Sequence, residues 1–234
     1  MPNRKILLIV ITLLVSLCSI CYELLLAQAL SLFLRNTVLR YCVTIGLYLF
    51  AMGLGARSVE GKMLDQPRKQ LLRVEILLTA AGGFLMLWLY GMDYLLGAGW
   101  LFSLLAHALI LIIGYLTGME LPILMELMKE DDPQAESRVL AFSYFGAVLG
   151  TFVFAFIYYP LTGLLTAAFV TGMLNGCAGL LTHYIDAESD TAPTKSFYAM
   201  LYLQLALFVM MCVCLMFVPG INEFCLRLYL NQGV

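Results

Sequence analysis

Charged residues are scarce in this sequence. Only 12% of its 234 residues are Asp, Glu, Lys or Arg, whereas 62% are hydrophobic. Soluble domains are about half apolar and a quarter charged, so the composition excludes a soluble globular protein. The net charge of −2 also argues against a nucleic-acid-binding protein, which would need an excess of basic residues.

Several motifs of known chemistry are missing as well. No Gly-rich nucleotide loop follows a predicted strand, and neither HExxH nor GxSxG occurs. Cys18-x-x-Cys21 has the spacing of a redox or metal pair, but it has no second pair and it lies inside an apolar run. His107 and His183 fall in other segments, so we predict no metal and no cofactor.

Long apolar runs take the place of these features. Segments of roughly 20 residues, the length that a bilayer requires, alternate with charged or Pro- and Gly-containing breaks. The sequence predicts an all-α, polytopic transmembrane helix bundle over 1–220, then a linker-like tail over 221–234 with no soluble catalytic domain. About seven spans are expected, at 6–34, 38–56, 71–91, 95–119, 138–159, 162–184 and 197–218.

The basic residues predict how this bundle is oriented. Cytoplasmic segments of membrane proteins are enriched in Lys and Arg. With the N-terminus inside, three basic residues fall outside, and ten fall inside: Arg4, Lys5, Arg57, Lys62, Arg68, Lys69, Arg73, Lys129, Arg138 and Lys195. We therefore expect a bacterial inner-membrane protein with a cytoplasmic N-terminus and, after seven spans, an outside C-terminus.

One acid stands within the first apolar run, in CSICYELLLAQ. Glu23 shares a helical face with the hydroxyl residues Thr12, Ser16 and Ser19, and such a face points into a bundle rather than toward lipid. An ionised carboxylate at that depth costs at least a few kcal/mol, so an intramembrane acid is a functional candidate. The alternative is a protonated carboxyl that donates one structural hydrogen bond.

Other polar residues in the predicted spans are weaker candidates. We add Glu120, His107, Ser143 and Asn175 to Glu23 and Ser19 as substrate-binding or proton-coupling candidates. Each has a structural alternative, since His107 and Asn175 can simply hydrogen-bond between helices. Glu75 is expected at the membrane interface, and Glu130-Asp131-Asp132 is expected to be a solvated loop.

Three blocks of the sequence resemble a known family. They are CSICYELLLAQALSLFLRNTVLRYCVTIGLYLFAMGLGA, GMELPIL and VLAFSYFGAVLGTFVFAFIYYPLTGL, and together they look like the membrane domain of bacterial spermidine-synthase-like proteins. In that family, transmembrane helices precede a soluble aminopropyltransferase domain. The loop GLGARSVEGKMLDQPRKQ is also loosely similar to one in half of a major-facilitator transporter. Ser143 stands where the family pattern has an acid, which leaves a charge pair at this helix in doubt.

Two functions compete at this point. The first is a carrier that binds or transports a small cationic solute, for which the resemblance implies a polyamine, through an interior polar cavity. The second is a non-transporting anchor or scaffold for a partner such as a synthase-like enzyme. The expected partners are the lipid bilayer and a second copy or another subunit. We expect the chain itself not to be an enzyme, because the catalytic domain of the family is not in the sequence.

Overall fold

A computed structural model describes residues 2–61, 64–97, 99–130, 132–185 and 195–230 of the chain. All regular structure in these ranges is helical, which confirms the predicted class. The elements are α1 (Pro2–Leu34), α2 (Thr37–Ser58), α3 (Pro67–Gly83), α4 (Leu85–Leu96), α5 (Trp100–Lys129), α6 (Ala135–Val153), the π-helical η2 (Phe154–Thr162), α7 (Gly163–Leu181), the short 3-10 turn η3 (Thr182–Tyr184), α8 (Lys195–Met216) and α9 (Val218–Leu230).

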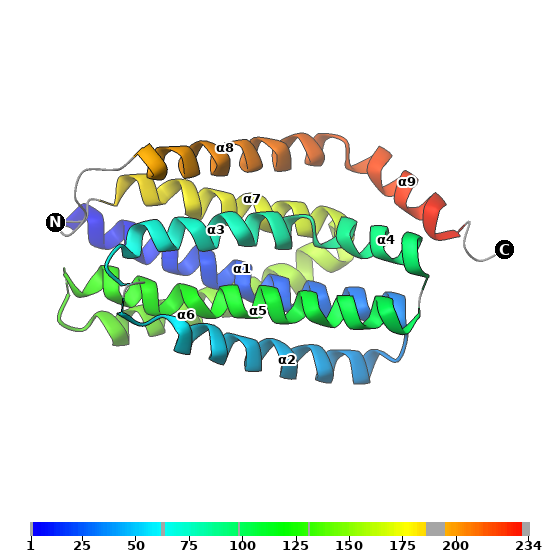
Figure 1. Cartoon of the computed structure of the whole chain (residues 1–234), viewed down its shortest axis with the longest axis horizontal. Helices are drawn as coiled ribbons and strands as arrows, with labels where there is room; N and C mark the ends of the chain where they lie inside the picture. The colour runs from blue at the N-terminus through cyan, green and yellow to red at the C-terminus, as the bar shows by residue number, and fades with distance from the viewer. Residues whose placement is uncertain (1, 62–63, 98, 131, 186–194, 231–234) are drawn as a thin grey trace.

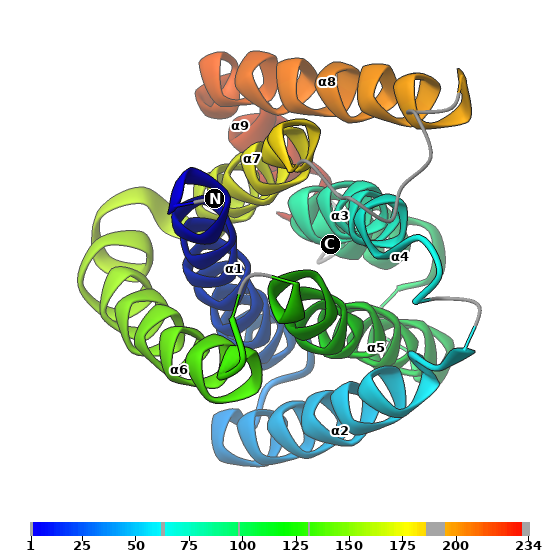
Figure 2. The same cartoon turned by 90° about the vertical axis from the view of Figure 1, so that its left-hand side faces the viewer.

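The helices form one elongated bundle with α1 near its centre. Figure 2, a view along the bundle, shows α6, α2, α5, α3 and α7 arranged around α1, with α8 outside α7. The closest packing partners are α2 with α5, α1 with α6, and α3 with α7. The N-terminus lies at one end of the bundle and the C-terminus at the other (Figure 1).

Two short breaks reverse the chain by left-handed backbone conformations. Arg35 and Asn36 both have a φ of 56°, and the Asn36 side chain caps α2 by accepting a hydrogen bond from the Leu39 N–H group at 3.4 Å. Asn tolerates this conformation better than most residues. Gly163, with a φ of 78°, begins α7 where η2 ends. These turns allow α2 to run antiparallel to α1, and α7 to run antiparallel to α6 (Figure 1).

The third predicted span is bent rather than straight. The structure divides it into α3 and α4, which meet at an angle of 51°. Gly82 and Gly83 immediately precede the bend, and paired small residues are a common cause of helix kinks. A side chain at Gly82 would overlap the ring of Tyr22 from α1, so the glycine also lets these helices approach closely.

Within the described residues, five helices could cross a membrane by length and composition, or up to six if α3 and α4 form one broken span. Residues 135–184 are one helix in this number, because α6, η2 and α7 are continuous along the chain. The expectation of seven spans is therefore not confirmed. In the predicted tail, residues 221–230 belong to α9, and 231–234 lie outside the described residues.

The contact between α2 and α5 depends on glycine. A Cβ atom at Gly114 would lie 2.8 Å from the carbonyl oxygen of Tyr48, and one at Gly118 would overlap the carbonyl oxygen of Met52. Both neighbours are backbone atoms, which cannot move aside without displacing α2. Small residues at such positions let helix backbones pack directly against each other.

We expect Gly118→Ala to lower the stability of the protein by about 1–3 kcal/mol, because the added methyl group overpacks this contact. Gly53→Ala is the matched control, since Gly53 lies in α2 with nothing within 4 Å of an added Cβ. It should be neutral or stabilising by about 0.5–1 kcal/mol. Thermal unfolding in detergent measures both variants, and equal effects would contradict the role given to Gly118.

Candidate functional site: a polar cavity and a buried acid cluster

Four of the six candidate residues lie on one cavity. It has a volume of about 340 Å³ and lies between α1, α2, α5 and α6. Ser19 and Glu23 reach it from α1, Glu120 from α5 and Ser143 from α6. Residues that are far apart in the sequence thus meet on a shared wall.

Hydroxyl groups join the helices around this cavity. Ser16 of α1 donates a hydrogen bond to the Ser143 hydroxyl of α6 at 3.0 Å. The Tyr48 hydroxyl of α2 donates to the carbonyl oxygen of Ser19 at 2.9 Å. Glu23 is 8% exposed and lines the cavity beside these groups. Hydroxyl and carboxyl groups therefore form a polar strip on a cavity whose lining is otherwise apolar.

A second acidic group lies directly behind the cavity. The carboxyl groups of Glu120 and Glu75 are hydrogen-bonding partners, and both residues are at most 2% exposed. Asn175 of α7 donates from Nδ2 to Glu75 Oε2 at 2.7 Å. Thr79 accepts a hydrogen bond from Gln204 Nε2 of α8 at 3.0 Å and extends the cluster. Glu120 belongs to both features, since it lines the cavity and contacts Glu75.

The position of Glu75 corrects the sequence analysis. We expected this residue at the membrane interface, but its side chain is fully buried in the bundle. The spacing in the sequence indicates this buried position, because Glu75, Thr79 and Gly82 follow one another at intervals of four and three residues and so share one face of α3. Gln204 was missed as well, although it is an isolated amide in the apolar α8.

His107 stays apart from these acids. Its Nδ1 atom lies 2.5 Å from the carbonyl oxygen of Ser103, one turn earlier in the same helix. Glu120 lies thirteen positions after His107 in α5, which places the two residues about 20 Å apart along the helix axis. The structure therefore does not join His107 to the acids, as a shared proton relay would require.

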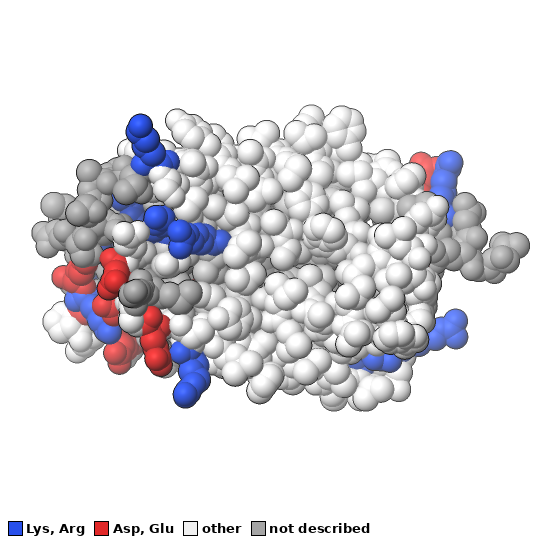
Figure 3. Space-filling model, viewed as in Figure 1, with Lys and Arg blue, Asp and Glu red and all other residues white. Residues whose placement is uncertain are grey.

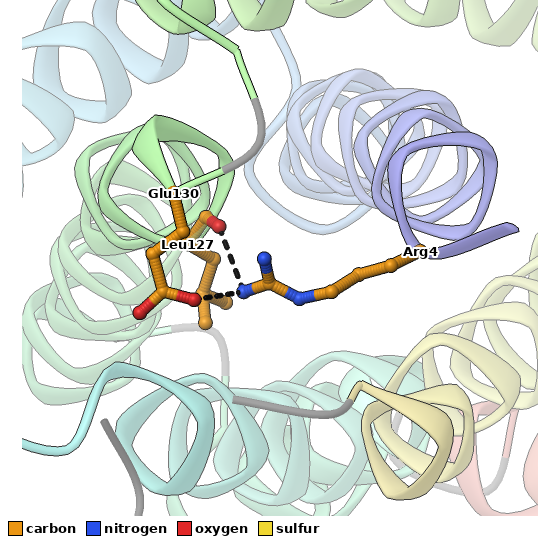
Figure 4. Close-up of polar contacts among 3 residues, drawn as sticks. All are labelled: Arg4, Leu127 and Glu130. Atoms are coloured by element: carbon orange, nitrogen blue, oxygen red, sulfur yellow. Dashed lines mark hydrogen bonds and ion pairs between the residues drawn. The ribbon is translucent and has the colours of Figure 1, made fainter. Parts of the chain in front are cut away.

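Charged side chains gather where α1 begins and α5 ends. Arg4 donates from Nη2 to the carbonyl oxygen of Leu127 at 3.0 Å and to Glu130 Oε2 at 2.6 Å (Figure 4). Lys5 and Arg138 both form ion pairs with Asp132, at 2.7 and 2.5 Å.

This end of the bundle corrects a second expectation. Glu130, Asp131 and Asp132 were predicted to lie in a solvated loop. Glu130 is exposed, although it pairs with Arg4, whereas Asp132 is 6% exposed and pairs with Lys5 and Arg138. Asp131 is outside the described residues. Arg68, also buried, donates to the carbonyl oxygens of Thr182 and His183 and tethers α3 to the end of α7.

The curated proteins described here as similar to this chain are all named polyamine aminopropyltransferase. The chain is 34% identical over 168 residues to a polyamine aminopropyltransferase of Leptospira interrogans. This alignment covers 70% of the chain and 32% of the relative. The corresponding protein of Oceanobacillus iheyensis is 32% identical, covering 73% of this chain and 34% of the relative. Polyamine aminopropyltransferase 2 of Ralstonia nicotianae is 31% identical to the chain, and the alignment covers 78% of this chain and 36% of the relative.

The chain thus spans about a third of the length of the curated relatives that it matches. No protein-family model and no solved structure matches it. The relatives support a relationship to spermidine-synthase-like proteins, as the sequence blocks suggested. The narrower resemblances, to a membrane domain and to half of a major-facilitator transporter, stay predictions.

These relatives overturn the two functions inferred from the sequence. Their shared name is that of an enzyme, so the prediction of a carrier for a cationic solute is wrong, and an anchor or scaffold is no better supported. The prediction that the chain is not an enzyme is contradicted by the same finding. That prediction rested on a catalytic domain missing from the sequence, which covers only part of each relative's length.

The charged end gives the protein a defined acid sensitivity. The hydrogen bond from Lys5, with that from the Gln134 N–H group and the charge of Arg138, lowers the pKa of Asp132 to about 2. An unfolded Asp titrates at about 3.9, so the contribution of Asp132 to stability is complete above that pH and is lost as the pH falls toward 2.

We therefore expect Asp132→Asn to lower the thermal midpoint at neutral pH. The difference from the wild type should shrink as the pH falls from about 4 to about 2. Glu126→Gln is a suitable control, because it removes an exposed ion pair with Lys129 on α5. Exposed pairs contribute little, about 0–1 kcal/mol. Parallel midpoint curves for the wild type and Asp132→Asn would contradict this role of Asp132.

Proposed function

We propose that this chain acts in aminopropyl transfer to polyamines, as a helical part of a polyamine aminopropyltransferase. The observation that carries the proposal is the shared name of eight relatives, which are 29–35% identical to the chain. Each alignment covers more than half of this chain, so the similarity includes much of the helical bundle rather than one short motif.

The reaction in this proposal moves an aminopropyl group from a donor to an amine. A new C–N bond forms at the acceptor nitrogen, the bond between the aminopropyl carbon and its leaving group breaks, and the nitrogen loses a proton. The attacking amine must be neutral, because an ammonium nitrogen has no free electron pair. Polyamines are largely protonated at neutral pH, so the complete enzyme must supply a group that takes up this proton.

We also propose that the bundle crosses the bacterial cytoplasmic membrane, with the charged end on the cytoplasmic side. Lys, Arg, Asp and Glu side chains cluster at the end near the N-terminus, and the middle of the surface seen in Figure 3 is free of them. Arg35, Arg40 and Arg227 lie toward the opposite end, where α1 ends, α2 begins and α9 is found. This distribution supports the orientation expected from the excess of basic residues.

In this arrangement the chain crosses the membrane seven times. The crossings are α1, α2, the bent α3–α4 pair, α5, α6, α7 and α8, and successive ones run in opposite directions along the bundle (Figure 1). α1 is about 50 Å long, which exceeds the hydrocarbon thickness of about 30 Å, so its N-terminal turns extend to the charged end.

The orientation predicts which positions are accessible from each side. Reporter domains fused after Ser58 and after Gln134 should be cytoplasmic, and a reporter fused after Leu96 should be outside the cytoplasm. Alkaline phosphatase is active only outside the cytoplasm and green fluorescent protein is fluorescent only inside, so the two reporters together give the side of the membrane on which each fusion point lies. If all three fusion points lay on the same side of the membrane, the proposed topology would be contradicted.

Deletion of the gene for this chain tests the proposed function. We expect the bacterium that carries it to convert less isotope-labelled putrescine to spermidine, and the reintroduced gene to restore the conversion. Mass spectrometry of cell extracts measures the labelled product, and uptake of labelled putrescine is measured in the same cells. Reduced uptake with unchanged conversion of the putrescine already inside the cells would contradict the proposal.

A further inference from the structure

The acid cluster behind the cavity has no basic partner. Neither Glu75 nor Glu120 forms an ion pair with a Lys or Arg within the part of the chain that the structure describes. The buried guanidinium groups of Arg4 and Arg68 instead bind the backbone and Glu130 at the charged end. The two carboxyl groups must therefore balance their charge by another means.

The partners of the cluster supply too few hydrogens for two carboxylates. Asn175 Nδ2 reaches one oxygen of Glu75, while no N–H or O–H donor of another described residue reaches Glu75 Oε1 or Glu120 Oε1. Two ionised carboxylates in contact repel each other strongly when both are removed from water. One proton removes the repulsion, because a carboxylic acid can donate its O–H to the neighbouring carboxylate.

We propose that Glu75 and Glu120 form a buried proton-binding site, which holds one shared proton and exchanges it with the cavity through Glu120. Glu120 is the connecting residue, because it touches Glu75 and also lines the cavity. Glu23 is the other acid that lines this cavity. This inference does not depend on aminopropyl transfer.

The side chains that surround Glu75 and Glu120 do not ionise near neutral pH, so the two carboxyl groups are the ones that can gain or lose a proton there. α1 contributes a thiol and a phenol, α2 contributes a second phenol, and α7 and α8 contribute amides. A buried thiol or phenol carries no charge near neutral pH, and amides do not ionise there. These groups are Cys18, Tyr22, Tyr48, Asn175 and Gln204.

Infrared spectroscopy of the protein in lipid vesicles tests this site. The protein is labelled with ¹³C-glutamate, so that its carboxyl bands are distinct from those of Asp, and it carries Glu23→Gln to remove the other cavity acid. We expect a protonated glutamate C=O band at neutral pH that shifts in D₂O. The band should be lost in the Glu75→Gln/Glu120→Gln variant and retained in the Glu126→Gln control.

A cavity variant tests the route of exchange. Ala147 lines the cavity from α6, and Ala147→Phe should slow the D₂O shift without removing the band. Circular dichroism and gel filtration show whether each variant is folded. If the double variant does not fold, the labelled protein with Glu23→Gln alone still decides, because absence of the band there overturns the proposal. Loss of the band on addition of sodium at constant pH would also overturn it, since the site would then hold a metal cation.

Discussion

Polar groups inside a bundle this apolar must satisfy one another, because little water reaches them. An unpaired buried polar group costs about 1–3 kcal/mol, and an unpaired charge costs more. The cluster of Glu75, Glu120 and Asn175 joins three helices and meets this constraint in part, because Asn175 donates to Glu75 and the two carboxyl groups contact each other. One oxygen of each carboxyl group accepts no hydrogen bond from another described residue, which is the deficit that one shared proton removes. α3, α5 and α7 each contribute a side chain to this cluster, and Glu120 also lines the cavity between α1, α2, α5 and α6.

The two ends of the bundle are built from different interactions. At the N-terminal end, Arg4, Lys5 and Arg138 join α1 to the α5–α6 connection through Glu130 and Asp132. In the middle, side-chain charge is confined to the interior, and the helices approach each other over glycine. The charged end therefore holds the helix termini together while the glycine contacts set the distance between α2 and α5.

The relatives change what this architecture is taken to mean. Inward polar stripes and a mid-helix acid are features of solute carriers, and the sequence was interpreted in that way. The relatives are named for an enzyme, and they match this chain over about a third of their own length. An interior with buried acids is thus compatible with a part of an enzyme, because the same desolvated carboxyls can hold protons without a solute.

The sequence by itself determined the class of the protein. Its apolar runs predicted an all-helical bundle, and the isolated Glu23 within the first run identified a polar helix face, since helix period and hydropathy are local properties. The sequence placed Glu75 wrongly because the position of Arg73 and Glu75 near the start of a span looks the same for an interfacial and a buried acid. It also missed Gln204, which gains its partners only when α8 packs on α3 and α7.

Only the tertiary structure decided which polar residues meet. Glu23, Glu120 and Ser143 are separated by many residues, and their common cavity depends on the packing of α1 against α5 and α6. The close approach of Gly82 in α3 to the Tyr22 ring of α1 is likewise a contact between helices. Such contacts depend on distances between helices, and the periodicity of a single helix contains no information about its neighbours.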